Sequence, residues 1–205
     1  LECLNTMNRK QIDEKIQEVA AMCRLNVEHL RRFPHAFSGG QRQRICIARA
    51  LVARPEFVVC DESVSALDVS IQAEIINLLM DLQQQLQLTY LFIAHDLSVV
   101  AHISTDVAVL YVGRFVELAT TEQLFFNPLH PYTRALLSAV PVPDPSAGRP
   151  RTVLKGEVPS VEKLPRGCGF HTRCPHAEAL CRTQSPSLNG RESNREHQVA
   201  CHLFG

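Results

Sequence analysis

Two short apolar runs, each followed by a polar pair, constrain the fold of this chain more than any other feature. The first run covers residues 57–60 and precedes Asp61-Glu62, and the second covers residues 90–94 and precedes His95-Asp96. Helical spacing of apolar residues flanks both runs, and helices that alternate with uninterrupted apolar strands indicate a parallel sheet covered on both faces. In such sheets the carboxyl ends of the strands form the active site. We therefore predict an α/β domain with both polar pairs on one edge of its sheet.

Apolar spacing and helix breakers predict the remaining elements. Ser38 is expected to be the N-cap of a helix, because its hydroxyl can accept a hydrogen bond from the first turn. The expected helices cover residues 9–30, 38–53, 71–86, a segment from 97 onward, and 132–140, and two further strands cover 107–112 and 115–118.

A proline-rich segment is expected to divide the chain. Eight of the twelve prolines lie from Pro141 onward, and Pro141 to Pro145 is typical of a stiff linker. We predict a domain boundary near residue 145, with a first domain over 1–145 and an irregular, cysteine-rich tail over 146–205. The tail has too few apolar residues for a core of its own.

Charge and hydropathy exclude two classes of function. The chain has 205 residues, and its 21 basic residues balance its 21 acidic ones. Nucleic-acid binding usually needs a clearly basic face, so this balance gives no reason to expect it. No stretch approaches the roughly 20 apolar residues that a membrane span requires, and the first residues do not resemble a signal peptide. We expect any membrane contact to go through a partner protein.

The segment Ser38-Gly39-Gly40-Gln41 is a candidate phosphate-binding helix start. A helix N-terminus offers unpaired N–H groups and the positive end of the helix dipole, and glycines let a phosphate approach the backbone. A plain N-cap with two flexible glycines is an equal alternative on these four residues alone. The continuation over residues 42–51, Arg-Gln-Arg-Ile-Cys-Ile-Ala-Arg-Ala-Leu, favours the functional interpretation.

With that continuation, the segment 37–51 resembles the signature loop and helix of ABC transporter ATP-binding subunits. The resemblance continues in order, because residues 57–62 are similar to a Walker B strand, residues 65–68 to a D-loop, and His95 to the switch histidine. It implies a parallel sheet like that of P-loop NTPases, with part of the ABC helical subdomain. In that family the signature loop acts on ATP held by the opposite subunit of a dimer.

The resemblance also implies roles for single residues, with ATP and Mg²⁺ as cofactors. Asp61 would hold Mg²⁺ through water, Glu62 would deprotonate the attacking water, and His95 would contact the γ-phosphate. Asp68 of the D-loop would join the nucleotide site. Without this context the acidic pair would be a solvated strand end, and His95 a structural histidine. Ser63 departs from the family, which usually has Pro or Ala there.

One family motif is absent from these 205 residues. No Gly-x-x-x-x-Gly-Lys-[Ser/Thr] occurs, so the Walker A loop that cradles the phosphates is missing, as is the glutamine loop. We expect an incomplete, N-terminally truncated ATPase that begins inside the helical subdomain and does not bind Mg-ATP in a site of its own. The alternative is a non-catalytic subunit fragment that acts as an interaction module.

The eight cysteines form two groups. The first four are scattered and are expected to be buried, reduced thiols; they are Cys3, Cys23, Cys46 and Cys60. The other four crowd into the tail as C-x5-C-x6-C-x19-C, namely Cys168, Cys174, Cys181 and Cys201. Four thiolates can hold zinc or an iron–sulfur cluster, the neighbouring histidines 171, 176, 197 and 202 could replace them on zinc, and unligated thiols remain an alternative.

Three segments resemble the oligopeptide and dipeptide permease branch of the family: residues 127–137, 169–175 and 199–203. The resemblance implies an importer of di- or oligopeptides, and it favours a [4Fe-4S] cluster over zinc on the tail cysteines. The implied partners are a second ATP-binding subunit, two membrane permeases and, indirectly, a peptide-binding protein, at the cytoplasmic face of the cell membrane. A soluble ABC protein of translation or repair would need a second ATPase core or a long coiled coil, and this sequence contains neither.

Overall fold

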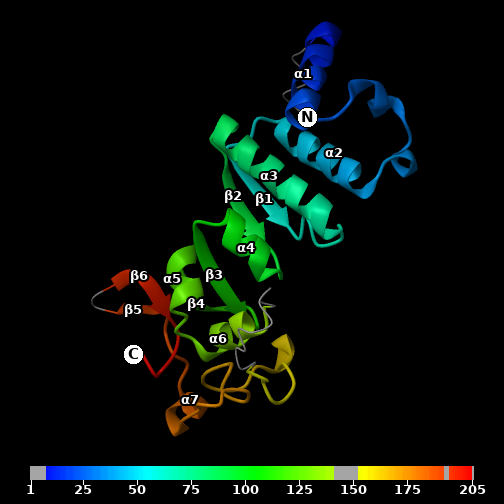
Figure 1. Ribbon diagram of the computed structural model, residues 1–205. Helices are drawn as coiled ribbons and strands as arrows, with labels where there is room; N and C mark the ends of the chain where they lie inside the picture. Colours follow the sequence, from blue (N-terminus) through cyan, green and yellow to red (C-terminus); the bar gives the residue numbers. More distant parts are fainter. Residues whose placement is uncertain (1–7, 141–151, 192–193, 205) are drawn as a thin grey trace, which may run out of the picture. The chain divides into compact units, whose positions relative to one another are not determined.

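The computed structural model describes residues 8–140, 152–191 and 194–204. The chain forms two compact units, Leu1–Val99 and Val100–Gly205 (Figure 1). The predicted boundary near residue 145 and the proline linker lie outside the described residues and stay predictions. Cys3 also lies outside them.

The first unit contains a parallel pair of strands joined by a long helix (Figure 1). Strands β1 and β2 pair in parallel, with Val59 opposite Leu91, which confirms the predicted parallel arrangement. Helix α1 ends eight residues earlier than expected, because Arg24 adopts a left-handed conformation with φ of 54° and a short 3-10 helix follows. The elements in order are α1 (Arg9–Met22), η2 (Val27–Arg31), η3 (Pro34–Ala36), α2 (Gly39–Leu51), β1 (Phe57–Asp61), α3 (Val69–Leu86) and β2 (Thr89–Ile93).

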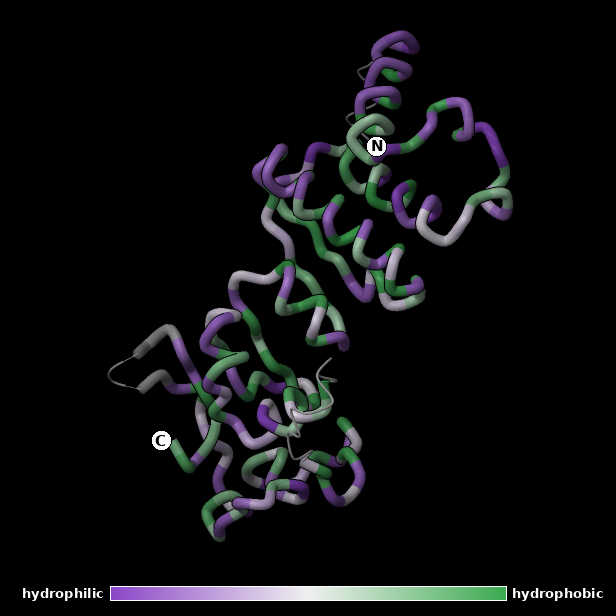
Figure 2. Tube along the Cα trace, viewed as in Figure 1, coloured by the Kyte–Doolittle hydropathy of each residue, from purple (hydrophilic) through white to green (hydrophobic). Residues whose placement is uncertain are grey.

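The strands β1 and β2 are partly buried on one face and exposed on the other. Their strongly apolar sequences appear green in Figure 2, and we expected burial on both faces. On one face α3 packs against the sheet, and the Tyr90 hydroxyl donates to the Leu79 carbonyl at 3.0 Å. The opposite face has four apolar side chains between 45% and 54% exposed, so the expectation was wrong there; they are Phe57, Val59, Leu91 and Ile93.

The second unit is built on an antiparallel sheet in the order β3-β4-β6-β5, which the sequence analysis did not foresee. Val112 and Gly113 both have positive φ, 46° and 75°, which makes the tight two-residue turn of a hairpin. The elements are β3 (Asp106–Tyr111), β4 (Arg114–Thr120), α5 (Thr121–Phe126), α6 (Pro131–Ser138), η4 (Val161–Lys163), α7 (Ala179–Thr183), β5 (Asn189–Arg191) and β6 (Asn194–Val199). Helix α4 (Leu97–Ile103) spans the boundary between the units.

A fully buried carboxylate holds the second unit together. Glu117 of β4 accepts hydrogen bonds from the backbone N–H groups of Leu129, at 2.7 Å, and His130, at 3.0 Å. The ring of His197, from β6, donates to the same carboxylate at 2.7 Å. Buried polar groups need such partners, because each unmet hydrogen bond costs about 1–3 kcal/mol. Glu117 therefore fastens the segment before α6 and the C-terminal strand to one sheet.

His130 makes the stability of this unit depend on pH. Its Nδ1 accepts the N–H of Tyr132, and burial lowers its pKa to about 4, although Glu117 opposes the shift. The unfolded chain takes up this proton near pH 6.5 and the folded chain only near pH 4, so stability falls as the pH drops through that window.

We predict that acidification from pH 7 to pH 5 removes on the order of 2 kcal/mol of stability through His130. Urea unfolding at both pH values measures the loss. His130→Asn is the matched control, because asparagine can also cap a helix but does not titrate. Its unfolding midpoint should change less with pH, and an equal change in both proteins would contradict the prediction.

Candidate functional site

The acidic pair at the end of β1 is held in an unusual backbone conformation. Glu62 has a φ of 45°, in the left-handed region, and its N–H donates to the Ile93 carbonyl at 2.9 Å. The Ser65 hydroxyl donates to the Glu62 carbonyl at 3.0 Å and closes the turn. Strained residues of this kind persist only where their surroundings fix them, and they cluster at active sites. The turn keeps Glu62 at the carboxyl end of β2.

Glu62 and His95 meet at the mouth of a small cavity. His95 Nδ1 lies 3.6 Å from Glu62 Oε1, and the two side chains are 70% and 59% exposed. The cavity has a volume of about 40 Å³, and its lining comes from the ends of β1 and β2 and the start of α3. The structure thus brings together the two residues that the strand ends predicted, and both side chains remain open to a ligand from solvent. Their catalytic roles stay predictions.

Two further residues, Gln72 and Ser63, adjoin this pair, and the sequence singled out only Ser63. The Gln72 side chain lines the cavity and donates to the Val64 carbonyl at 2.8 Å, which ties α3 to the turn after Glu62. Nothing in the spacing distinguished it from other polar positions of the helix. The Ser63 hydroxyl is buried with no hydrogen-bond partner among the described residues. The lack of a partner for this hydroxyl agrees with the family resemblance, in which Pro or Ala, neither of which has a hydroxyl, usually occupies this position.

The signature segment forms a reciprocal capping box. Ser38 Oγ accepts the Gln41 N–H at 3.3 Å, and Gln41 Oε1 accepts the Ser38 N–H at 3.1 Å. The N-cap was predicted, but the return bond from Gln41 was not. The first N–H groups of any α-helix have no intrahelical partner, so those of Gly39 and Gly40 remain available beside the Ser38 hydroxyl hydrogen. These donors at the positive end of α2 suit a phosphate.

Asp68 has a capping role that the structure makes explicit. Its Oδ1 accepts the N–H of Ile71 at 3.1 Å and the hydroxyl of Ser70 at 2.8 Å. The bond from Ile71, helped by Ser70, holds the pKa of Asp68 below its usual value, so the carboxylate is ionised at neutral pH. Asp68 therefore begins α3 as its N-cap. Its expected contact with nucleotide stays a prediction.

The scattered cysteines follow the prediction at two positions and depart from it at a third. Cys23 and Cys60 are buried; burial raises the pKa of Cys23 to about 11 and also raises the pKa of Cys60. Cys46 is exposed, so its predicted burial was wrong. Helix α2 turns Ile47 and Leu51 inward instead, and the residue next to Ile47 faces solvent.

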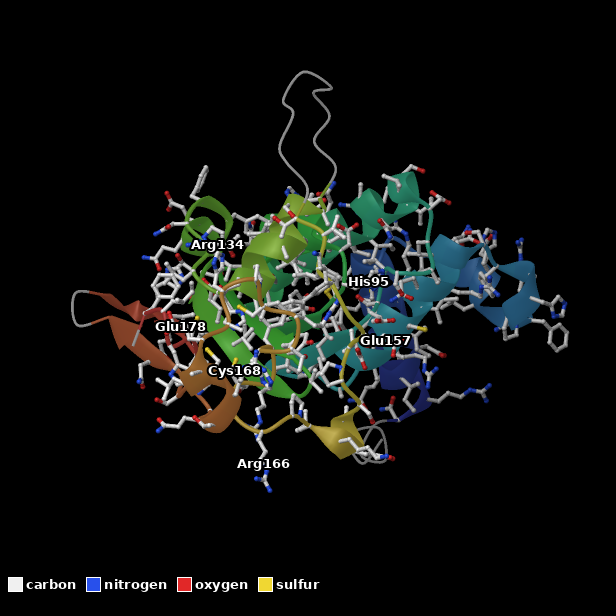
Figure 3. All side chains as sticks on the ribbon, turned by 90° about the horizontal axis from the view of Figure 1, so that it is seen from below. His95, Arg134, Glu157, Arg166, Cys168 and Glu178 are labelled. Carbon is white, nitrogen blue, oxygen red and sulfur yellow. The ribbon has the colours of Figure 1, made fainter. Side chains whose placement is uncertain are left out.

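The tail cysteines are gathered around a close backbone contact, and metal binding by them stays a prediction. The Cys168 N–H donates to the Cys181 carbonyl at 2.8 Å, and Cys168 is labelled in Figure 3. Burial raises the pKa of the thiols of Cys168, Cys174 and Cys201, and the neighbouring thiols raise it further. Across residues 8–140, 152–191 and 194–204, no group of three or more His, Cys, Asp or Glu side chains is arranged to hold a metal ion.

Three of the histidines that were considered as zinc ligands are engaged elsewhere. The ring of His171 bonds to the Cys168 carbonyl at 2.8 Å, that of His202 to the Gln184 carbonyl at 3.0 Å, and that of His197 to Glu117. Each of these rings still has a second nitrogen, and histidines that bind a metal commonly donate their other N–H to a carbonyl or carboxylate, so these bonds alone do not exclude ligation. Within the described residues the side chains are nevertheless not arranged to hold a metal ion, and the structure gives no support to the expected iron–sulfur or zinc site.

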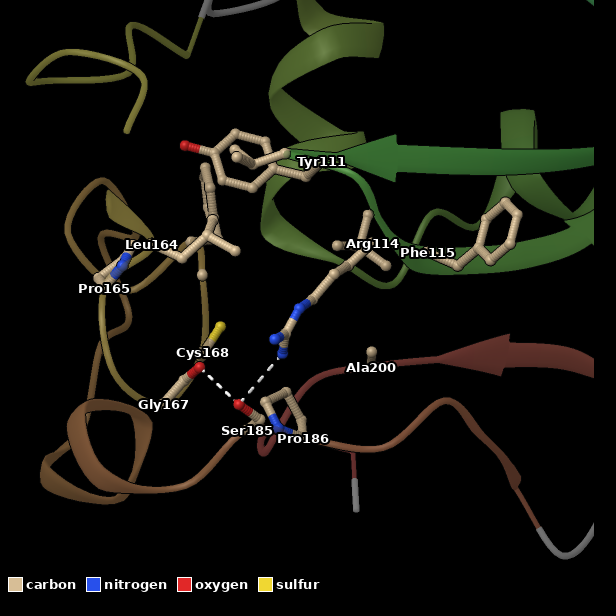
Figure 4. Close-up of a pocket in the computed structure, with 14 residues that line it drawn as sticks. Tyr111, Arg114, Phe115, Leu164, Pro165, Gly167, Cys168, Ser185, Pro186 and Ala200 are labelled. Carbon is tan, nitrogen blue, oxygen red and sulfur yellow. Dashed lines mark hydrogen bonds between the residues drawn. The ribbon is translucent and has the colours of Figure 1, made fainter. Parts of the chain in front are cut away.

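A second cavity of about 50 Å³ lies in the second unit (Figure 4). Arg114 extends from β4 towards Ser185, with Nη1 to Oγ at 3.4 Å, and the Ser185 hydroxyl donates to the Gly167 carbonyl at 2.7 Å. Tyr111 and Cys168 form part of its lining. No sequence pattern predicts this cavity, because its lining comes from segments far apart in the chain.

Two families match separate parts of the chain. Residues 3–65 match the family described as ABC transporter, and residues 116–181 match the family described as oligopeptide/dipeptide transporter, C-terminal region. The oligopeptide transport ATP-binding protein AppF of Bacillus subtilis (strain 168) is 54% identical over 202 residues, which are 98% of this chain and 61% of AppF. The chain belongs to the ABC transporter ATP-binding proteins of the oligopeptide/dipeptide branch.

Other relatives agree with this assignment. The di/tripeptide transport ATP-binding protein DppF of Pseudomonas aeruginosa (strain UCBPP-PA14) is 49% identical over 97% of this chain and 61% of DppF. The structure of cbiO1 from Clostridium perfringens, part of an ABC transporter complex, matches with a TM-score of 0.55 and 27% identity, over 62% of this chain and 50% of cbiO1. The chain thus spans about three-fifths of the length of its curated relatives.

The described helices show no membrane span. None of them combines the length and the apolar character that a crossing of the bilayer requires.

We predict that Ser38→Ala lowers the stability of the first unit by about 1 kcal/mol, because the signature loop loses its cap. Ser38→Asp should keep most of that stability, since aspartate is an equally good N-cap. Urea unfolding of the two variants and the parent measures the difference. Equal losses in both variants would show that the capping box does not stabilise α2.

Proposed function

We propose that this family member serves as the ATP-hydrolysing subunit of an importer for di- or oligopeptides. The observation that carries the proposal is the placement of Glu62 beside His95 at the cavity that ends β1 and β2. An acid and a histidine at the carboxyl edge of a parallel sheet are suited to activate water and to stabilise a phosphate. The family assignment and the peptide-transport relatives support the choice of cargo.

The residues on this edge fit Mg-ATP as the ligand. Asp61, exposed at the end of β1, offers the oxygen ligands that Mg²⁺ prefers, directly or through water. The Ser38 hydroxyl and the first N–H groups of α2 offer donors for a phosphate of ATP held by a neighbouring subunit. When bound, ATP supplies the phosphoanhydride bond whose hydrolysis drives the transport cycle.

The roles of the two central side chains follow from their chemistry. Glu62 accepts a proton from the attacking water, and its exposed carboxylate can reach solvent to do so. His95 donates a hydrogen bond to the terminal phosphate and stabilises the charge that develops there. Their separation of 3.6 Å lets both side chains act on the same group. Asp68 completes the site by fixing the start of α3 near the signature segment.

The proposed partners are those of a binding-protein-dependent importer. They are a second ATP-binding subunit, which holds the ATP that the signature contacts, two membrane permeases, and a peptide-binding protein that acts through the permeases. The proposed location is the cytoplasmic face of the cell membrane, where the subunit is peripheral. The comparisons give no support to the alternative of a non-catalytic interaction module.

Metal binding by the four tail cysteines also remains a proposal, supported only by the spacing of the four residues and their resemblance to the permease branch. Metal analysis after anaerobic purification tests it. We expect about four irons per chain if a [4Fe-4S] cluster forms. Zinc would favour the alternative, and a metal-free protein would remove both.

We predict that Glu62→Gln, placed in a subunit that also carries a Walker A loop, abolishes ATP turnover while ATP stays bound, because the amide cannot accept the proton from water. The loss should be at least about 100-fold, the usual contribution of a general base. Turnover by the assembled transporter in proteoliposomes and retention of labelled ATP are the two measurements.

Ser63→Ala is the matched control one residue further on. Its hydroxyl has no partner in the described part of the chain, so its removal should leave turnover unchanged and stability equal or higher. Undiminished turnover in Glu62→Gln would exclude Glu62 as the base. A similar loss in both variants would indicate damage to the turn instead.

A further inference from the structure

The two glycines of the signature segment face the interior of the first unit. A Cβ atom on Gly40 would lie 2.7 Å from Cγ2 of Ile71, and Gly40 is buried. A Cβ atom on Gly39 would lie 3.3 Å from Cδ2 of Leu67. Leu67 lies just before α3, and Ile71 lies in the first turn of that helix. Because glycine has no side chain, the D-loop and the start of α3 can pack closely against the start of α2.

The contact between Gly40 and Ile71 is close and rigid. Real Cβ atoms essentially never approach another heavy atom within 3.0 Å, so any side chain at position 40 would force a shift. Ile71 cannot turn away easily, because its Cγ2 branches directly from Cβ and its χ1 has one strongly preferred value in a helix. Leu67 differs, since its Cδ2 is the far end of a flexible side chain.

One turn further along, α2 and α3 make a second contact. Arg44 Nη2 of α2 lies 3.0 Å from Glu74 Oε2 of α3, and the Arg44 side chain is only 12% exposed. Arg44 is four residues after Gly40, and Glu74 is three residues after Ile71, so both contacts lie along the same helix–helix seam. The start of α3 is in turn capped by Asp68 through the Ile71 N–H. Signature, D-loop and helix start are thereby fixed to each other.

We infer that Ile71 is a positioning residue for the signature segment, and that Gly40 is required by its packing on Ile71 rather than by the approach of a nucleotide. Ile71 has no polar atom in its side chain and acts only through α2. It sets where the free N–H groups at the start of α2 point. The expected effect on ATP turnover rests on the proposed function, whereas the expected effect on packing does not.

A double-variant cycle tests the inference. Gly40→Ala should reduce ATP turnover of the assembled transporter by on the order of tenfold, because the new methyl group overlaps Ile71. Gly40→Ala combined with Ile71→Ala should recover most of the turnover, since the removed branch makes room for that methyl group. Gly39→Ala should cause the smaller loss, because the end of Leu67 can move.

The matched control combines Gly40→Ala with Val69→Ala. Val69 lies on the same helix start but is 82% exposed, so its truncation makes no room at position 40 and should not rescue turnover. If the parent is active and the pair with Ile71→Ala folds but stays as inactive as Gly40→Ala, the glycine serves the nucleotide and the inference is wrong. A pair that does not fold also overturns the inference.

Urea unfolding of the 205-residue chain provides the second readout. The unfolding midpoint should fall in Gly40→Ala and recover in the pair with Ile71→Ala, whatever the protein hydrolyses. If the parent protein itself shows no turnover, recovery of the midpoint in the pair would refute the proposed function and leave the packing inference intact. Absence of recovery in the midpoint would overturn the inference itself.

Discussion

The parallel pairing of β1 with β2 determines where the polar chemistry of the first unit lies. Its register places Asp61 opposite Ile93, so the two strands end at the same level. The next bond, from the Glu62 N–H to the Ile93 carbonyl, carries this register past the end of the strand. Glu62 and His95 meet for that reason, although 32 positions of sequence separate them. A shift of one residue would turn every side chain of a strand to the opposite face and separate the pair.

Local signals predicted the parts of the fold that depend on local physics. The N-cap at Ser38 and the helix that ends at Leu86 were predicted because capping and apolar periodicity act over a few residues. The same reasoning could not predict the antiparallel sheet of the second unit. Besides its hairpin partner β3, strand β4 pairs with β6, about 80 residues later, and no local pattern records that second pairing.

The sequence predicted which residues belong to the candidate site better than it predicted the contacts that hold them in place. The motif residues were identifiable because their chemistry is concentrated in short segments. The residues that hold them in place could not be identified, because Gln72, Ile71 and the Gln41 side chain act through contacts that only the folded chain reveals. Burial was misjudged at Cys46 and on one face of β1, where apolar composition alone does not say which side a neighbouring element covers.

The exposed thiol of Cys46 has a practical consequence for studies of the signature helix. It is the exposed cysteine among those in the described part of the chain, and it lies on α2, two turns after the glycines. Cys23 and Cys60 are buried thiols with raised pKa values, so they react slowly with electrophiles. A maleimide fluorophore would therefore attach to Cys46 first within residues 8–99. Its emission would then report directly on movements of the helix that carries the signature.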